Sequence, residues 1–263
     1  MSRQNKPIRS DIAYSMPDKL VVRGFDLPKE LIGVLNVGDF AWLQLTGSKP
    51  TTEQSRMFNA ILVTLAEHGI TPSALVARMT YLGAPEALQA AVAAGLCGLG
   101  STFVGSTEGV ARMLYEALPP GQPAGEDLRA KARAIVEGYR ARREHLPGFG
   151  HPVHKPVDPR TTRLFHVAEE CRFAGDYVRL IQRVAEEAEK SFGRPLTLNA
   201  TGAIGAICCE LGFKWQIVRG LGVMARAVGL VGHILEESVQ PMAGEIWLRA
   251  EEEASAHLRN PGC

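Results

Sequence analysis

The chain has 263 residues, a formal net charge of +1, 46% hydrophobic residues and 22% charged residues. This length allows one large domain or two small ones, and the composition excludes disordered, fibrous and disulfide-stapled small proteins. The balanced charge argues against a general nucleic-acid or membrane-surface partner but leaves room for local cationic pockets. An odd number of cysteines, 5, and a polar start without an apolar signal segment predict a reducing, cytoplasmic location.

Helical patterns dominate the chain after one strand-like run over residues 19–26, which Pro28 ends. Thr51 and Gln54 form a capping box that opens a helix over 51–68, with His68 near the inner end of its apolar stripe. The uncharged stretch 87–107 is long enough to cross a bilayer, but its glycines and polar side chains favour a buried helix. The expected fold class is all-α, mainly helical, with helices near 73–82, 85–100, 126–143, 161–172, 176–192, 202–211 and 217–237.

The segment LPGFGHPVHKPVDPR, residues 146–160, contains four prolines and is expected to be an irregular loop. Its two glycines let the main chain approach a ligand closely. An imidazole, an ammonium and a guanidinium follow within about a dozen residues, at His151, Lys155 and Arg160. The segment is typical of an anion and nucleotide cradle, although a surface loop with solvated charges has the same composition.

Two generic motifs do not fit their usual function. His151 and His154 have a metal-like spacing, but they lie in a proline-bracketed loop and no carboxylate or thiolate repeats the spacing, so no metal site is expected. Gly220, Gly222 and Ala225 match a dinucleotide-binding pattern. No convincing strand and turn precede them, so close helix packing is the expected role.

Four segments together resemble a known family. PGFGHPVHKPVDPR, residues 147–160, resembles the PGFGH-x-V-x-K-x-x-DPR segment of citrate synthases, and residues 66–69, 198–202 and 226–233 resemble three further family segments in the same order. The short length and residues 100–105 are most similar to the citryl-CoA lyases and the C-terminal citryl-CoA lyase module of ATP-citrate lyase. Phe103 stands where the synthases have a histidine.

The resemblance implies a citrate synthase-like, all-α homodimer or higher homo-oligomer. A large helical domain would comprise residues 1–120 and 215–263, and a small domain, residues 121–214, would carry the coenzyme A loop. The implied ligands are an acyl-CoA, as substrate or product, and a citrate-like polycarboxylate. No metal, nucleic acid or membrane is implied.

The resemblance also implies roles for single residues. His68 and His151 would contact the carboxylates and hydroxyl of the acid, and Arg160 and Arg226 would form bidentate pairs with carboxylates. His151 would also be the base that takes the hydroxyl proton when the carbon–carbon bond breaks in a retro-Claisen cleavage. The remaining expected contacts are substrate-binding Asn199, Phe103 and Arg249, the last donated across the dimer interface, and coenzyme A-binding Pro147, Gly148, Phe149, Gly150 and Lys155.

The main departure from the family is Thr201, which occupies the position of the carboxylate that moves a proton at the acetyl-CoA methyl carbon. Since Phe103 also lacks an imidazole, ordinary citrate synthesis is not expected. Three interpretations stay open. The first is a carbon–carbon lyase or acyltransferase in which Thr201 donates to the enolate oxygen. The others are a non-catalytic regulatory homologue that binds coenzyme A and polycarboxylates, and a helical structural protein whose histidines, His68 included, are satisfied within the core.

Overall fold

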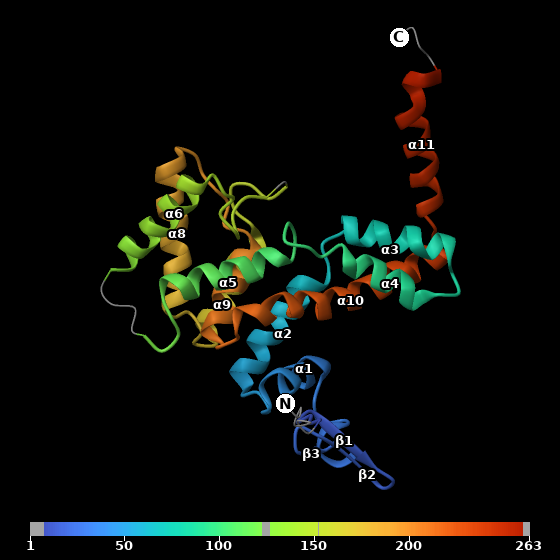
Figure 1. Ribbon diagram of the computed structural model, residues 1–263, viewed down its shortest axis with the longest axis horizontal. Coiled ribbons are helices and arrows are strands. Elements are labelled where there is room, and N and C mark those ends of the chain that lie inside the picture. The colour runs from blue at the N-terminus through green and yellow to red at the C-terminus, as the bar shows by residue number, and fades with distance from the viewer. Residues whose placement is uncertain (1–7, 123–126, 152, 260–263) are drawn as a thin grey trace, which may run out of the picture. The chain divides into compact units, whose positions relative to one another are not determined.

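The computed structural model describes residues 8–122, 127–151 and 153–259. Contacts within the chain divide it into two units, one up to Ala60 and one from Ile61 onward (Figure 1). This division differs from the predicted large and small domains, and the assignment of residues 121–214 to a separate small domain stays a prediction. The proposed linker over 119–125 lies partly outside the described residues.

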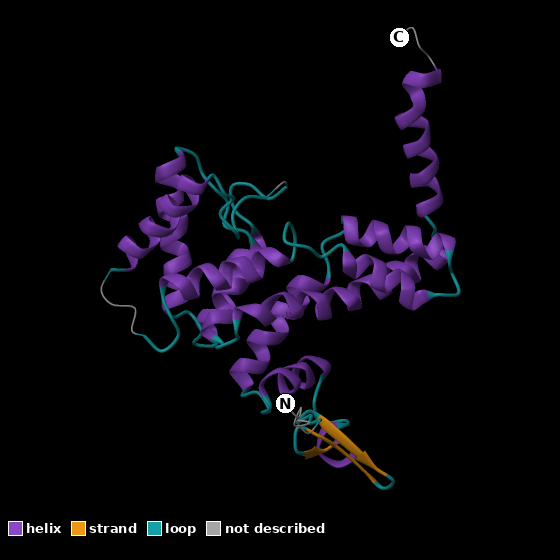
Figure 2. Cartoon of the chain, viewed as in Figure 1, coloured by secondary structure: helices purple, strands orange, loops and turns teal. Residues whose placement is uncertain are grey.

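The first unit contains the strands of the described chain, which Figure 2 shows in orange. They form one antiparallel sheet in the order β1-β2-β3, with Tyr14 opposite Val21. The predicted strand over 19–26 is therefore two strands, because Arg23 and Gly24 both have positive φ and form a turn. The elements of this unit are β1 (Ala13–Met16), β2 (Lys19–Val22), β3 (Phe25–Asp26), the π-helix η1 (Leu27–Leu31), α1 (Val37–Thr46) and the start of α2 (Thr52–Ala66).

Within its described residues, the second unit has helices as its named regular elements, which confirms the predicted all-α class for most of the chain. The capping box of α2 is also confirmed, because Thr51 and Gln54 bond each other's main-chain N–H groups. The helices of this unit are α3 (Pro72–Gly83), α4 (Leu88–Cys97), α5 (Gly105–Ala117), α6 (Leu128–Arg142), α7 (Pro159–Glu170), α8 (Asp176–Phe192), α9 (Ala200–Glu210), α10 (Trp215–Val239) and α11 (Ala243–Arg259).

Helix α10 is the central element of this unit, since it packs against α3, α4, α5 and α9. It is long and apolar enough to cross a membrane by length and composition, yet 44% of its most apolar window is buried inside the fold. A Cβ atom at Gly222 would collide with the side chain of Val104. The glycine pattern in α10 therefore serves close packing, as predicted, and begins inside a helix rather than at a strand-to-helix turn.

The remaining helices pack against one another as follows. Helix α6 packs on α8, and α9 lies against α5, α7 and α8. The loop between α6 and α7 contacts the segment before α9 through a bridge between Phe149 and Leu198. Helix α11 packs on α3 and leaves large apolar side chains exposed, at Trp247, Leu248 and Leu258.

Candidate functional site

His68 lies in the loop between α2 and α3 and not in the helix predicted for it. Helix α2 ends at Ala66, two residues early, because the Glu67 carboxylate accepts the main-chain N–H groups of His68 at 2.8 Å and Gly69 at 2.7 Å. Gly69 then takes a positive φ of 71°. The exposure of His68 rules out the alternative that it is a core histidine.

The loop before α7 is tied to the N-terminus of α9. Phe149 forms an isolated antiparallel bridge with Leu198, in which Gly150 donates to the Thr197 carbonyl at 2.8 Å and Asn199 donates to the Gly148 carbonyl at 3.0 Å. Gly148 has a φ of 81°, and a Cβ there would lie 2.6 Å from the Cα of Gly202. Only glycine fits this position, so the predicted irregular loop is ordered by close contact with α9.

The proton on the neutral His151 ring is placed by its hydrogen bonds. Its Nδ1 accepts the main-chain N–H groups of Val153 at 3.1 Å and His154 at 2.8 Å, so this nitrogen carries no proton. The proton of the neutral ring is then on Nε2, which lies 3.3 Å from Arg160 Nη2. A guanidinium nitrogen only donates. Two donors therefore lie side by side, and one anionic oxygen can accept from both.

Three imidazoles gather at this point. The ring centroids of His151 and His154 lie 4.4 Å apart, and the His68 ring is 5.4 Å from the first and 5.8 Å from the second. Burial lowers the pKa of both His68 and His151, and the charge of Arg160 lowers both further. These two rings are therefore neutral at pH 7 and offer hydrogen bonds rather than fixed charge.

One ring nitrogen each of His68, His151 and His154 lies within 4.8 Å of the others, a grouping able to surround a metal ion. The chemistry of the donor set does not favour one. A metal-bound imidazole normally donates its second N–H to a neighbour, whereas Nδ1 of His151 accepts two hydrogen bonds. The Arg160 guanidinium beside His151 also repels a cation. The cluster is better suited to an anionic or hydroxylic ligand.

Arg160 is fixed by Asp158, the buried N-cap residue of α7. The carboxylate accepts from Arg160 Nε at 3.0 Å and Nη2 at 2.8 Å, and also from the main-chain N–H of Ala200 at 3.0 Å. Burial raises the pKa of Asp158, but these hydrogen bonds lower it by more, so the carboxylate is charged. One edge of the guanidinium is thus occupied, and the edge formed by Nη1 and Nη2 is left for a ligand.

Arg226 is only 3% exposed and uses all of its nitrogens within the chain. Nε donates to Ser73 Oγ at 3.1 Å, Nη2 to Thr71 Oγ1 at 2.6 Å and Nη1 to the Ala66 carbonyl at 3.1 Å. Nη1 also pairs with Glu67 at 3.3 Å, so four of the five N–H groups of Arg226 are engaged, and the predicted bidentate pair with a substrate carboxylate would have to displace one of these contacts. In this geometry Arg226 holds the loop that carries His68.

A buried polar network continues from Arg226 toward the end of α10. Glu67 pairs with Arg226 at 3.3 Å and with His233 Nε2 at 3.1 Å. Nδ1 of His233 faces Arg78 Nη2 at 2.9 Å, and Arg78 Nη1 donates to Glu237 at 2.8 Å. His233 is therefore held within this network, with Nδ1 accepting and Nε2 donating.

Thr201 and Asn199 are engaged in local structure. The Asn199 side chain caps α9 by accepting the N–H groups of Thr201 and Gly202, and it donates to the Gly150 carbonyl at 2.7 Å. The Thr201 hydroxyl lies 2.6 Å from Asn199 Oδ1 and 3.1 Å from Ser106 Oγ. Since an amide oxygen only accepts, the hydroxyl proton of Thr201 points to Asn199.

The other predicted residues differ in their exposure and in their contacts within the fold. Phe103 is 48% exposed in the turn before α5, and Lys155 is exposed in the loop beyond His154. Pro147 is half-buried beside Gly148, whose main-chain groups, like those of Gly150, already bond within the fold. Arg249 lies exposed on α11, and within the described residues the chain brings it into no contact with the three histidines.

Several residues of this region were not predicted from the sequence. The turn made by Glu67 and the buried Arg78 have no local signal, because their partners lie in the main chain or are distant in sequence. Asp158 and Arg160 are two residues apart, but their side-chain pairing depends on the folded loop. His154 was considered only as a metal ligand. Its nearness to His68 requires the folded chain.

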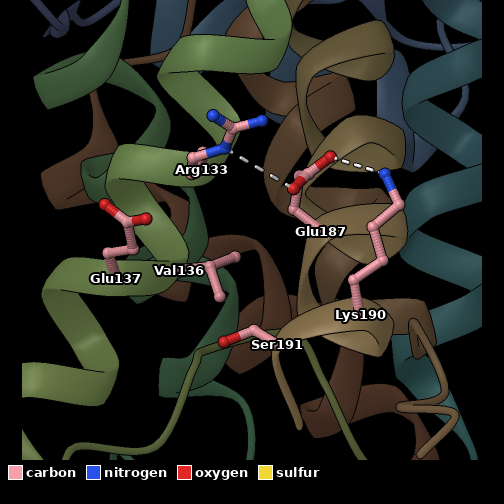
Figure 3. A pocket seen from close by; sticks show the side chains of 6 residues that line it. All are labelled: Arg133, Val136, Glu137, Glu187, Lys190 and Ser191. Carbon is pink, nitrogen blue, oxygen red and sulfur yellow. Dashed lines mark hydrogen bonds and ion pairs between the residues drawn. The ribbon is translucent and has the colours of Figure 1, made fainter. Parts of the chain in front are cut away.

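A separate pocket of about 230 Å³ lies between α6 and α8 (Figure 3). Its cations are already neutralised, because Glu187 pairs with Lys190 at 2.8 Å and with Arg133 at 3.9 Å. None of the predicted site residues lines it. The chemistry-bearing groups are at the histidine cluster instead.

Known proteins are similar to this chain in sequence and in fold. Residues 34–247 match the family described as citrate synthase, C-terminal domain. The chain is similar to citryl-CoA lyase from Hydrogenobacter thermophilus, with 34% identity, a TM-score of 0.78, and coverage of 88% of this chain and 87% of the other. ATP citrate lyase from Methanothrix soehngenii, solved with citrate and coenzyme A, shares the fold at 21% identity and a TM-score of 0.70, over 90% of this chain and 40% of the other.

A citrate synthase from Deinococcus radiodurans is 26% identical over 219 residues, which are 82% of this chain and 55% of that protein. The chain thus spans about half or less of the length of the first curated relatives that it matches. The matched segment covers most of the helical unit and all three histidines. This chain belongs to the citrate synthase family.

Proposed function

We propose that the protein is a carbon–carbon lyase that cleaves a citryl-CoA-like thioester into acetyl-CoA and a 2-oxo acid. The observation that carries the proposal is the pair of donors formed by His151 Nε2 and Arg160 Nη2, 3.3 Å apart. One oxygen of a hydroxy acid accepts from both. The 34% identity to a citryl-CoA lyase over nearly the whole of both chains supports the same chemistry.

The cleavage balances without a redox partner. The tertiary hydroxyl loses its proton, the bond between the carbinol carbon and the CH₂ carbon breaks, and its electron pair moves into the thioester as an enolate. The hydroxyl carbon becomes a ketone, and the enolate carbon takes up one proton to give acetyl-CoA. His151 and Arg160 stabilise the oxygen as its charge grows, by donating to it from fixed positions.

The predicted role of His151 as the base does not follow from its hydrogen bonds. The neutral ring already carries a proton on Nε2, so it donates to the substrate oxygen. His68 contributes a third polar contact from the opposite loop. Arg160 has one free edge for a carboxylate.

The proposed coenzyme A contacts are Lys155 with the phosphates and the 147–150 main chain with the adenine. The exposure of Lys155 leaves its ammonium free for a phosphate. Within the described chain, the N–H of Gly148 already donates to Ser106 Oγ and that of Gly150 to Thr197, so Phe149 is the loop position whose N–H has no partner. Adenine recognition here would therefore use the Phe149 main chain.

The proposed assembly is a homodimer or higher homo-oligomer. Large apolar side chains are exposed along α10 and α11, at Val228, Val231, Leu235, Val239, Trp247 and Leu248. Monomeric proteins rarely expose so many large apolar side chains to solvent, and a second copy of the chain would cover them. Arg249 on α11 would then be available to the partner's site. The cytoplasmic location is also a proposal, supported by cysteines that form no disulfide within the described residues, Cys97, Cys208 and Cys209.

A binding-only role is the second candidate, because of Thr201. No carboxylate stands at its position, and its hydroxyl proton points to Asn199 rather than outward. In that case the site would bind coenzyme A and a polycarboxylate without turnover, as a regulatory module. The retained donors at His151 and Arg160 serve either candidate equally.

The test is to incubate the purified protein with citryl-CoA and to measure acetyl-CoA and oxaloacetate by mass spectrometry, with and without a metal chelator. The lyase proposal expects both products in equal amounts, unaffected by the chelator. Thermal stabilisation by citrate and coenzyme A without product would support the binding-only candidate. Neither product nor stabilisation would contradict both.

A further inference from the structure

His154 is the one imidazole of the cluster to which the family resemblance gives no role. It lies on the same loop as His151, and its main-chain N–H fixes the proton of that ring on Nε2. The centroids of the two rings lie 4.4 Å apart and the interplanar angle is 31°, so the rings are in contact and tilted to one another. The His154 side chain is half-buried and faces His68 on the other side.

The geometry allows one substrate oxygen to touch all three rings. One ring nitrogen each of His68, His151 and His154 lies within 4.8 Å of the others. This spacing is short enough for one hydroxyl oxygen between the rings to form hydrogen bonds of normal length. A tertiary hydroxyl placed there would accept from one ring while it donates its proton to another.

The nearby groups other than His68 and His154 have their proton-accepting atoms occupied. Asp158 is buried and accepts from Arg160 and Ala200. The Glu67 carboxylate is half exposed, but it is turned toward the His68 and Gly69 main chain, Arg226 and His233. Nδ1 of His151 is filled. Within the described residues, the side-chain nitrogens of His68 and His154 make no hydrogen bond.

We propose that His154 is the catalytic residue that carries the proton from the substrate hydroxyl to the departing acetyl-CoA carbon. The inference rests on the proposed lyase function. His154 accepts the hydroxyl proton as the carbon–carbon bond breaks, and the same nitrogen returns it to the enolate carbon. These two atoms are separated by one carbon in the substrate, so one imidazole reaches both. The ring ends neutral, and no carboxylate is needed at position 201.

The choice between His154 and His68 follows from their settings. His154 stacks directly on His151, whose Nε2–H binds the same oxygen, and its loop is anchored to α9 on the α5 side. His68 lies on the α2–α3 loop, is exposed, and is held through Glu67 and Arg226. His68 therefore binds the acid, and His154 moves the proton.

The experiment compares wild type, His154→Ala, His154→Phe and His68→Ala in citryl-CoA cleavage, with free imidazole added. His166→Ala is the matched control, since that histidine is exposed on α7 and pairs with Glu170. For His154→Ala we expect kcat to fall about 10²–10⁴-fold with KM little changed. Imidazole should restore part of the rate in His154→Ala and none in His154→Phe, whose ring fills the space. His68→Ala should mainly raise KM.

Each other outcome is decisive. A His154→Ala enzyme with wild-type kcat, or one whose loss is a raised KM that imidazole does not repair, overturns the role of His154 and leaves the lyase function standing. Imidazole rescue of kcat in His68→Ala alone would move the role to His68. A wild-type protein that binds citrate but releases no product overturns the lyase function itself, and the proton transfer with it.

Discussion

Two polar clusters adjoin the loop that carries His68, and they differ in how their hydrogen bonds are completed. In the first, Arg78, His233, Glu67 and Glu237 are linked by alternating donors and acceptors, and each buried group has a partner. In the second, His151 Nε2 and Arg160 Nη2 lie 3.3 Å apart, and in the assigned tautomer both carry protons with no acceptor between them. A cluster in which every donor has an acceptor indicates a structural role. Neighbouring donors without a shared acceptor indicate a ligand-binding site.

The comparison also explains why two arginines that resemble family ligands are not equivalent. Each side-chain nitrogen of Arg226 donates a hydrogen bond within the chain, so Arg226 belongs to the structural cluster in this geometry. Arg160 keeps one edge free although Asp158 holds the other. The sequence motif alone makes both look alike, and only the hydrogen-bond partners separate them.

The largest effect is expected on stability, from breaking the structural cluster. Arg78→Ala leaves the Glu237 carboxylate buried without its cation, so the free energy of unfolding should fall by about 3–5 kcal/mol in urea titration. The control Arg112→Ala removes an exposed pair with Glu116 and should cost no more than about 1 kcal/mol. Equal losses for the two variants would contradict a structural cluster.

The second effect is on turnover. His151→Ala removes one of the two converging donors, so kcat for citryl-CoA should fall about 10²–10³-fold, while the unfolding midpoint changes little. His145→Ala is the control, since that exposed histidine lies before the loop. Unchanged kcat in His151→Ala would remove the second cluster from catalysis.

The third effect is on the pH dependence of stability. The pKa values of His68 and His151 are lowered in the folded protein, mainly by burial, from an ordinary value of 6.5. The unfolded chain then binds protons more readily, so their contribution is complete above pH 6.5 and is lost as the pH falls below it. We expect the urea midpoint of wild type to fall faster between pH 6.5 and 5 than that of a His68→Ala, His151→Ala double variant. Parallel curves would contradict the lowered pKa values.

The smallest effect is expected at Thr201, whose hydroxyl bonds to Asn199 in the folded chain. Thr201→Val should lower the free energy of unfolding by about 1 kcal/mol and leave kcat within the same order of magnitude. A drop in kcat of about 10²-fold without loss of stability would instead restore the predicted role of Thr201 as a donor to the enolate.

Much of this architecture follows from local sequence signals. Helix α8 was predicted with its observed bounds, and the capping box at Thr51 and the proline-rich loop before α7 were also expected. Strand β1 was missed because all of its residues are exposed and show no alternation. Helix α1 was missed although Asn36 caps it and Gly47 ends it, since each signal alone is common in loops.

The site was predictable in its residue types but not in its proton positions. The resemblance to the family segments identified His68, His151 and Arg160 as candidate site residues from the sequence alone. The tautomer of His151 depends on two main-chain N–H groups, and the inclusion of His154 depends on its ring lying against that of His151. Neither has a signature in the order of residues, because both arise from backbone conformation.

The most direct test of the contrast between the two clusters is long-range ¹H–¹⁵N NMR of histidine-labelled protein, with and without citrate. We expect His151 and His233 both to carry their proton on Nε2, and citrate to shift the Nε2–H signal of His151 while that of His233 stays in place. A proton on Nδ1 of His151, or a citrate response at His233 and none at His151, would contradict it.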